Sequence, residues 1–99
     1  MNFGQALEAL KDGERVSRQG WNGKGMFLYF VPGSIVAFED LRGPAKNAAI
    51  AATKIENGEQ GSSRHICGHI DMKAADGSLV VGWLASQTDM LADDWGIVD

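Results

Sequence analysis

Apolar residues near the amino terminus recur at the spacing of one helical face. The positions i, i+3, i+4 and i+7 are Phe3, Ala6, Leu7 and Leu10. This spacing predicts a one-sided helix that packs on a sheet. Asn2 and Gln5 can cap its start, and Asp12-Gly13 is expected to end it.

Two strand-like runs follow, separated by a turn. Residues 15–21 predict a strand, and Asn22-Gly23 predicts a hairpin because both residues tolerate positive φ. The next strand, residues 26–31, is apolar on both faces. A strand of a small antiparallel sheet normally keeps one face in water. One helix can cover only one side, so we expect the second face to meet another subunit or a ligand.

The middle of the chain has a different composition. Residues 35–39 predict a short strand, and the alanine-rich residues 44–54 predict a helix with Pro44 in its first turn. Residues 57–63 contain glycine and serine and predict a loop. We therefore interpret residues 42–63 as a helical and loop insertion, and as a candidate lid, within a single domain of residues 1–99.

Strand patterns return in the last third of the chain. Residues 65–73 predict a strand, Asp76-Gly77 a hairpin turn that leads to residues 79–83, and residues 94–98 a closing strand. The expected fold class is α+β: a small curved antiparallel sheet with the amino-terminal helix on one face and a short carboxy-terminal helix.

That short helix belongs to a polar stretch between Trp83 and Trp95. Ser86 is a good N-cap, and Asp89 three residues later resembles a capping box. We expect the helix to end near residues 93–94 and to turn Met90 and Leu91 toward the core. Polar side chains at a helix start beside an indole would suit a ring-bearing polar ligand. On the residues alone, a capped connector with two core tryptophans is the preferred interpretation.

Charge and composition exclude several classes of protein. The 99 residues carry a net charge of −4, which argues against duplex nucleic acid as a partner but not against a small phosphorylated ligand. Cys67 is the only cysteine, so no internal disulfide can form. Neither a signal peptide nor a membrane span is recognisable. We expect a cytoplasmic protein without a membrane partner.

Catalytic and metal-binding patterns are weak. His65, Cys67, His69 and Asp71 would share one face of a continuous strand. Alternate strand positions lie about 6.6–7 Å apart, too far to converge on one ion without a bulge. No nucleophile–base pair, dinucleotide fingerprint or phosphate loop is present. The sequence thus predicts no metal, no cofactor and no enzyme activity.

The remaining candidates are aromatic and basic side chains that could bind a ligand. The aromatic candidates are Trp21, Phe27, Tyr29, Trp83 and Trp95, and the candidate phosphate partners are Arg15, Arg18, Lys24, Arg42, Lys46 and Arg64. Stacking of a base on an aromatic ring contributes about 1–3 kcal/mol, against an association cost of at least about 4 kcal/mol. Tight capture of a small nucleotide therefore requires an enclosed pocket, which two subunits could form together.

Three segments of the chain resemble the type-two Thoeris anti-defence proteins of phages and prophages. They are Phe3 to Met26, which contains Gly20-Trp21-Asn22-Gly23-Lys24-Gly25; His69 to Gly77; and Trp83 to Trp95, which contains Ser86-Gln87-Thr88-Asp89. Residues 42–63 match nothing in the pattern, which leaves ligand choice open if they form a lid.

The resemblance implies a homotetramer, with ligand pockets at subunit interfaces, that sequesters glycocyclic ADP-ribose in the infected host cell without cleaving it and so blocks Thoeris defence. Some family members also capture cyclic oligonucleotides of the CBASS defence system. By position, Trp21, with Phe27 nearby, would face adenine or ribose, and Ser86, Gln87 and Asp89 would hold ribose hydroxyls or the base.

Three basic residues are chosen by charge as pyrophosphate partners: Arg18, Lys24 and Arg64. Trp83 completes the candidate site. Two other functions stay open on the sequence alone. One is a small cyclic-nucleotide hydrolase that uses His65 or His69, and the other is a phage protein-interaction module.

Overall fold

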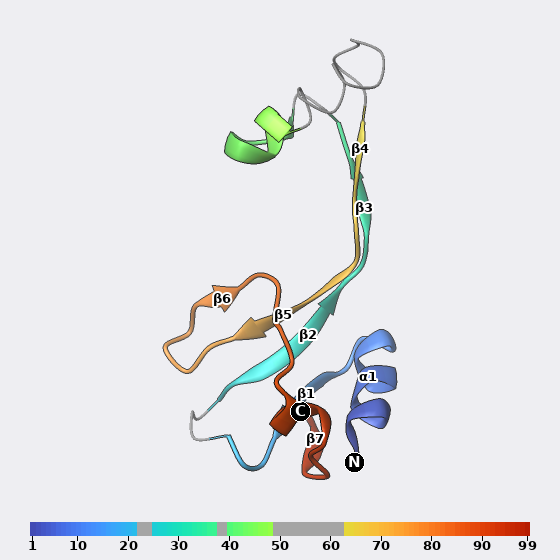
Figure 1. Ribbon diagram of the computed structural model, residues 1–99, viewed down its shortest axis with the longest axis vertical. Helices are drawn as coiled ribbons and strands as arrows, with labels where there is room; N and C mark the ends of the chain where they lie inside the picture. Colours follow the sequence, from blue (N-terminus) through green and yellow to red (C-terminus); the bar gives the residue numbers. More distant parts are fainter. Residues whose placement is uncertain (22–24, 38–39, 49–62) are drawn as a thin grey trace. The chain divides into compact units, whose positions relative to one another are not determined.

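The computed structural model describes residues 1–21, 25–37, 40–48 and 63–99. The chain divides into two compact units (Figure 1). The first contains Met1–Pro32 and His69–Asp99, and the second contains Gly33–Gly68.

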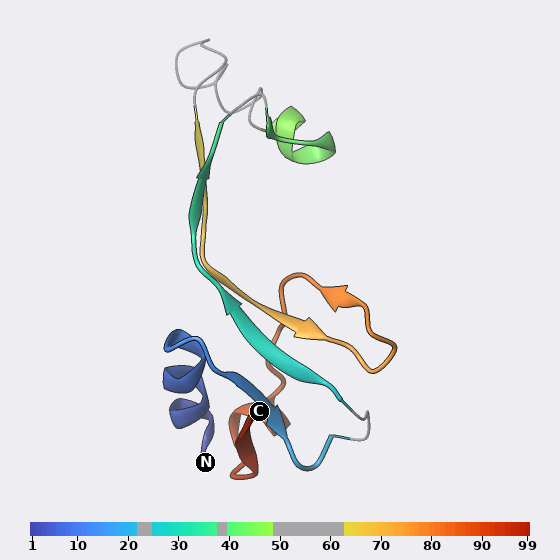
Figure 2. The same cartoon turned by 180° about the vertical axis from the view of Figure 1, so that it is seen from behind.

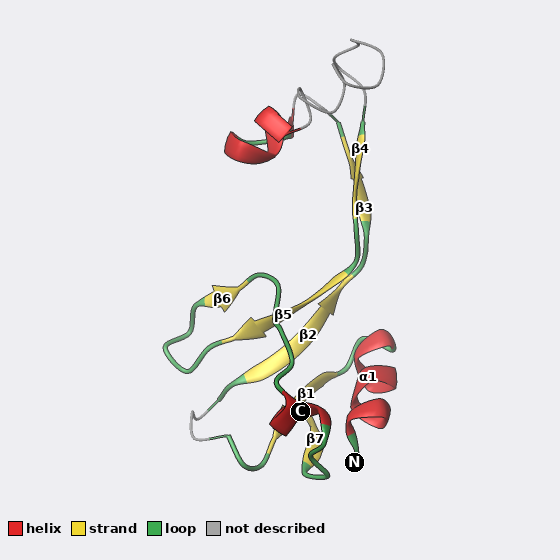
Figure 3. Ribbon diagram, in the orientation of Figure 1, coloured by secondary structure: helices red, strands yellow, loops and turns green. Residues whose placement is uncertain are grey.

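The first unit is built on a five-stranded sheet in the order β6-β5-β2-β1-β7, and every neighbouring pair is antiparallel. Its strands are β1 (Arg15–Arg18), β2 (Phe27–Val31), β5 (His69–Lys73), β6 (Leu79–Val80) and β7 (Trp95–Val98). Its helices are α1 (Phe3–Lys11) and α3 (Gln87–Met90) (Figure 3). The structure confirms the α+β class and the predicted hairpin at Asp76-Gly77. Strands β1 and β2 pair as predicted, but the turn predicted at Asn22-Gly23 lies outside the described residues.

Helix α1 forms where the sequence predicts it. Asn2 Oδ1 accepts a hydrogen bond from Gln5 N (2.8 Å), and Gln5 Oε1 accepts one from Asn2 N (2.9 Å), which completes a capping box. The helix ends at Asp12, and Gly13 follows with φ +91°, a conformation that glycine adopts without strain.

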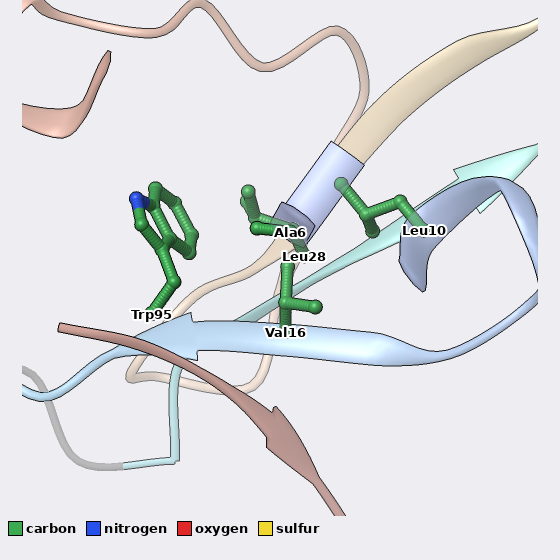
Figure 4. Close-up of a cluster of buried hydrophobic side chains, with 5 residues drawn as sticks. All are labelled: Ala6, Leu10, Val16, Leu28 and Trp95. Carbon is green, nitrogen blue, oxygen red and sulfur yellow. The ribbon is translucent and has the colours of Figure 1, made fainter. Parts of the chain in front are cut away.

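The apolar side of α1 covers one face of the sheet (Figure 4). The fully enclosed core side chains are Ala6, Leu10, Val16, Leu28 and Trp95. Strand pairing places Val16 opposite Leu28, and Leu28 opposite Met72, so the inward positions of three strands align.

The outward positions of the same strands bear a different set of side chains. Phe27 lies between two cations, with Arg15 Cζ 5.1 Å and Lys73 Nζ 5.9 Å from the centre of its ring. Tyr29 contacts the same ring edge-on, at 6.3 Å between centroids. Strand β2 is thus apolar on both faces as expected; a partner for its outer face stays a prediction.

The second unit contains a two-stranded antiparallel sheet of β3 (Ser34–Val36) and β4 (Arg64–Ile66) (Figure 2). Residues 43–48 are helical. The rest of the helix predicted over 44–54, and the loop predicted over 57–63 except Ser63, lie outside the described residues. The insertion over residues 42–63 therefore stays a prediction.

The single strand expected over residues 65–73 is wrong. Pairing runs from Val31 with His69 and resumes only at Ser34 with Ile66. Pro32 lies at this break and has no N–H to donate. A Cβ on Gly33 would lie 3.1 Å from Ile66 O, so the two backbones also approach closely here.

The break separates the four candidate metal ligands. His65 lies in β4 of the second unit and Cys67 follows that strand, whereas His69 and Asp71 lie in β5 of the first unit. They do not share one continuous strand face. Among the residues with a described position, no group of three or more His, Cys, Asp or Glu side chains could hold a metal ion.

Leu28→Ala should destabilise the fold by about 2–5 kcal/mol, because it removes a fully buried side chain from the centre of a small core. Urea denaturation monitored by tryptophan fluorescence measures the change. Lys11→Ala on the exposed side of α1 is the control, and we expect a change within about 0.5 kcal/mol. A Leu28 variant as stable as this control would contradict the position of the core.

Candidate functional site

The candidate site forms where the end of β1 meets the segment between β6 and β7. Strand pairing places Arg18 opposite Trp95, and the backbone N–H of Trp83 donates to Ile70 O at 2.7 Å. These contacts bring Trp21, Trp83 and α3 to one region although they are far apart in the sequence.

Helix α3 begins with the predicted capping box. Asp89 N donates to Ser86 Oγ (3.1 Å), and Ser86 N donates to Asp89 Oδ2 (3.3 Å). The helix is shorter than expected and ends at Met90. Met90 is 45% exposed and Leu91 80% exposed, so the prediction that both face the core is wrong. Trp95, on the following strand, belongs to the buried core.

Asp89 is the most connected side chain of the site. Its Oδ1 accepts hydrogen bonds from Arg18 Nη1 (2.9 Å) and Trp21 Nε1 (3.2 Å). Its main-chain oxygen accepts one from Trp95 Nε1 (3.0 Å). The side chain is only 13% exposed. An ionised carboxylate has about four acceptor positions, and the described residues Arg18, Trp21 and Ser86 occupy three of them.

Asp94 holds the other side of Arg18. Arg18 Nε donates to Asp94 Oδ1 at 2.9 Å, and Gly20 N donates to Asp94 Oδ2 at 2.7 Å. A Cβ on Gly20 would lie 2.9 Å from Asp94 Oδ2, so a side chain at this position would displace the Asp94 carboxylate. The sequence analysis missed Asp94 because its partner is 76 positions away and no local pattern links them.

The three tryptophans contact one another edge-to-face. The ring centroids of Trp21 and Trp95 are 5.4 Å apart, those of Trp83 and Trp95 6.2 Å, and those of Trp21 and Trp83 6.4 Å. Phe3 adds a further ring 5.5 Å from Trp95. Edge-to-face pairs stabilise by about 0.5–1.5 kcal/mol beyond their burial. Trp95 thus belongs to the buried core, whereas Trp21 and Trp83 are partly buried and extend from the core to the site.

Arg18, Asp89 and Asp94 shift one another's pKa values. The hydrogen bond from Arg18 lowers the pKa of Asp94. Burial opposes ionisation of Asp89, but hydrogen bonds from Arg18, Trp21 and Ser86 outweigh it and hold its pKa below the usual range. The bonds to Asp94 and Asp89 raise the pKa of Arg18 in turn. All three groups are charged at neutral pH, with one net negative charge.

The remaining predicted site residues lie elsewhere or are not brought together. Phe27 is on the outer face of the sheet, opposite the face that packs against Trp21 and Trp83. Arg64 belongs to the second unit, and Lys24 lies outside the described residues. Gln87 is exposed at the start of α3.

His69 and Asp71 form a second polar pair. His69 Nδ1 lies 2.8 Å from Asp71 Oδ1, which also accepts a hydrogen bond from Gly82 N at 2.8 Å. Asp71 is buried. The pair ties β5 to the segment that leads to Trp83, and this contact accounts for its burial without a catalytic role.

Acid should destabilise the protein through Asp89 and Asp94. Because their folded pKa values are lowered, the unfolded chain binds protons first as the pH falls below about 4. The stabilisation is present above that pH and is lost as the pH falls through the folded pKa values. Melting temperatures between pH 6 and 2 should fall less steeply for Asp94→Asn than for the unmodified protein. Glu8→Gln, which removes an exposed ion pair with Lys11, should keep the original slope; equal slopes for all three would refute the ion network.

The described part of the chain contains no helix long and apolar enough to cross a membrane.

A family model described as a Thoeris anti-defense 2-like domain matches residues 1–98. The protein named Thoeris anti-defense 2 from Bacillus phage SP01 is 39% identical over 98 residues, which cover 99% of this chain and 94% of that protein. The chain therefore belongs to the Thoeris anti-defense 2-like family.

Proposed function

We propose that this protein is a phage anti-defence protein that sequesters glycocyclic ADP-ribose in the infected bacterial cell without cleaving it, and so blocks Thoeris defence. Family membership supports the anti-defence role. The observation that supports ligand capture is the half-buried Trp21, whose Nε1–H is bound by Asp89 beside the capped start of α3.

The chemistry of this region favours the sugar and base of such a ligand. The described residues leave Asp89 about one of its acceptor positions, and the hydroxyl of Ser86, which accepts from Asp89 N, can still donate its own proton. Gln87 adds an exposed amide. These groups suit ribose hydroxyls or exocyclic amines, whereas the net negative charge of Arg18, Asp89 and Asp94 disfavours phosphate nearby.

The pyrophosphate would then be bound by cations outside this cluster. Lys24 and Arg64 are the candidates that the sequence supplies. We propose that they act within a homotetramer, in pockets formed between subunits. The apolar outer positions of β2 and several exposed apolar residues in the last third of the chain support association. Those most exposed are Leu79, Val81, Leu84 and Leu91. Capture of CBASS cyclic oligonucleotides at a separate site would extend the same function.

Glycocyclic ADP-ribose should raise the melting temperature of the purified protein by several degrees. A ligand that binds only the folded state stabilises by about 2.7 kcal/mol at a hundredfold excess over Kd. After heat denaturation the ligand should be recovered unchanged, as chromatography with mass detection can measure. Cleaved product would favour the hydrolase that uses His65 or His69, and its loss in His69→Gln would identify the base. No thermal shift with this ligand or with a panel of cyclic dinucleotides would favour a protein-interaction module.

Trp21→Ala should weaken capture at least about tenfold, since stacking on one aromatic ring contributes about 1–3 kcal/mol. Trp21→Phe keeps a ring but loses the N–H that Asp89 accepts, and its affinity should lie between those of Trp21→Ala and the original protein. Isothermal titration calorimetry measures both. Full affinity in Trp21→Ala would remove this side chain from the site.

A further inference from the structure

We infer that Arg18 and Asp94 are positioning residues, which fix the Asp89 carboxylate and the Trp21 indole for the ligand without touching it. This inference rests on the proposed function. It gives Asp94 a role in ligand capture and gives Arg18 a role other than binding pyrophosphate.

The geometry of the guanidinium supports this assignment. Arg18 Nε donates to Asp94 Oδ1 and Arg18 Nη1 donates to Asp89 Oδ1, both at 2.9 Å. The Arg18 side chain is 14% exposed. A guanidinium is planar and its N–H groups point in fixed directions. Two carboxylates bound to the same plane are therefore fixed relative to each other.

Each carboxylate also accepts a hydrogen bond from the segment around Trp21, and so restricts its position. Asp89 Oδ1 binds the indole N–H of Trp21, while Asp94 Oδ2 binds the backbone N–H of Gly20, the preceding residue. One arginine thus orients the tryptophan through both its side chain and its main chain. A bound ligand that stacks on this ring would meet it already ordered, which lowers the entropic cost of binding.

The same contacts argue against Arg18 as a phosphate ligand. Its Nε and Nη1 donate to carboxylates at 2.9 Å and its Nη2 donates to Asp94 Oδ2 at 3.5 Å, and the two acids together exceed its charge. A phosphate that approached would add a third anion to one cation. Lysine could not replace arginine here, because a single ammonium does not present two divergent N–H groups in a fixed plane.

Hydrogen exchange of the indole N–H groups tests the positioning directly and without ligand. The chain has three tryptophans, so the indole signals are few and assignable by NMR. In Arg18→Lys and Asp94→Asn, the Trp21 Nε1–H should exchange at least about tenfold faster. The Trp95 Nε1–H, which is bound to the main-chain oxygen of Asp89, should keep its rate and serves as the internal control. Unchanged exchange at Trp21 would overturn the inference.

Calorimetric titration with glycocyclic ADP-ribose tests the consequence for binding. At a temperature where all variants are folded, Arg18→Lys and Asp94→Asn should bind at least about tenfold more weakly, and Glu8→Gln, which removes the same charge as Asp94→Asn from an exposed site, should bind normally. A lowered melting temperature with unchanged affinity would reduce Arg18 and Asp94 to a structural role and overturn the inference. If the unmodified protein does not bind this ligand, the proposed function fails, whereas the indole exchange still decides the positioning.

Discussion

The rest of this site depends on the hydrogen bonds by which the Arg18 guanidinium joins Asp89 and Asp94. An ionised carboxylate removed from water is costly unless it is paired and hydrogen-bonded. Asp89 is 13% exposed and meets this requirement through Arg18, Trp21 and Ser86. Without Arg18, Asp89 and Asp94 would lack the cation that they share and would repel each other, and Trp21 would lose the constraint on its orientation.

This ion network also connects the site to the stability of the fold. Among the described residues, the enclosed core around Trp95 contains two leucines, one valine and one alanine, which is modest for a domain that must offset its conformational entropy. The indoles of Trp21 and Trp83 extend this core toward the site. The same rings are thus candidates for ligand contact and part of the packing, so mutations there should be judged by affinity and stability together.

Helix caps and turns, which depend on a few neighbouring residues, could be predicted from the sequence. The capping boxes at Asn2 and Ser86 and the turn at Asp76-Gly77 each require side chains within four positions, and the structure confirms them. The bond between Arg18 and Asp94 spans 76 positions, and charge alone offered Arg18 many partners.

The two wrong predictions, a single strand over residues 65–73 and the burial of Met90 and Leu91, also concern features that neighbouring residues do not determine. Composition does not reveal that Pro32-Gly33 interrupts pairing opposite Cys67-Gly68, since the partner strand is remote in sequence. Likewise, Met90 and Leu91 are apolar, but helix α3 is one turn long and has no apolar face to bury.

The placement of Phe27 bears on how the proposed ligand could be bound. Trp21 packs against the face of the sheet that α1 covers, whereas Phe27 lies on the other face, between Arg15 and Lys73. Within one chain, the sheet itself lies between the two rings. A ligand that contacts both is therefore most simply held between two copies, with Trp21 from one subunit and Phe27 from another. The two aromatic candidates thus favour an interface pocket over a pocket within a single chain.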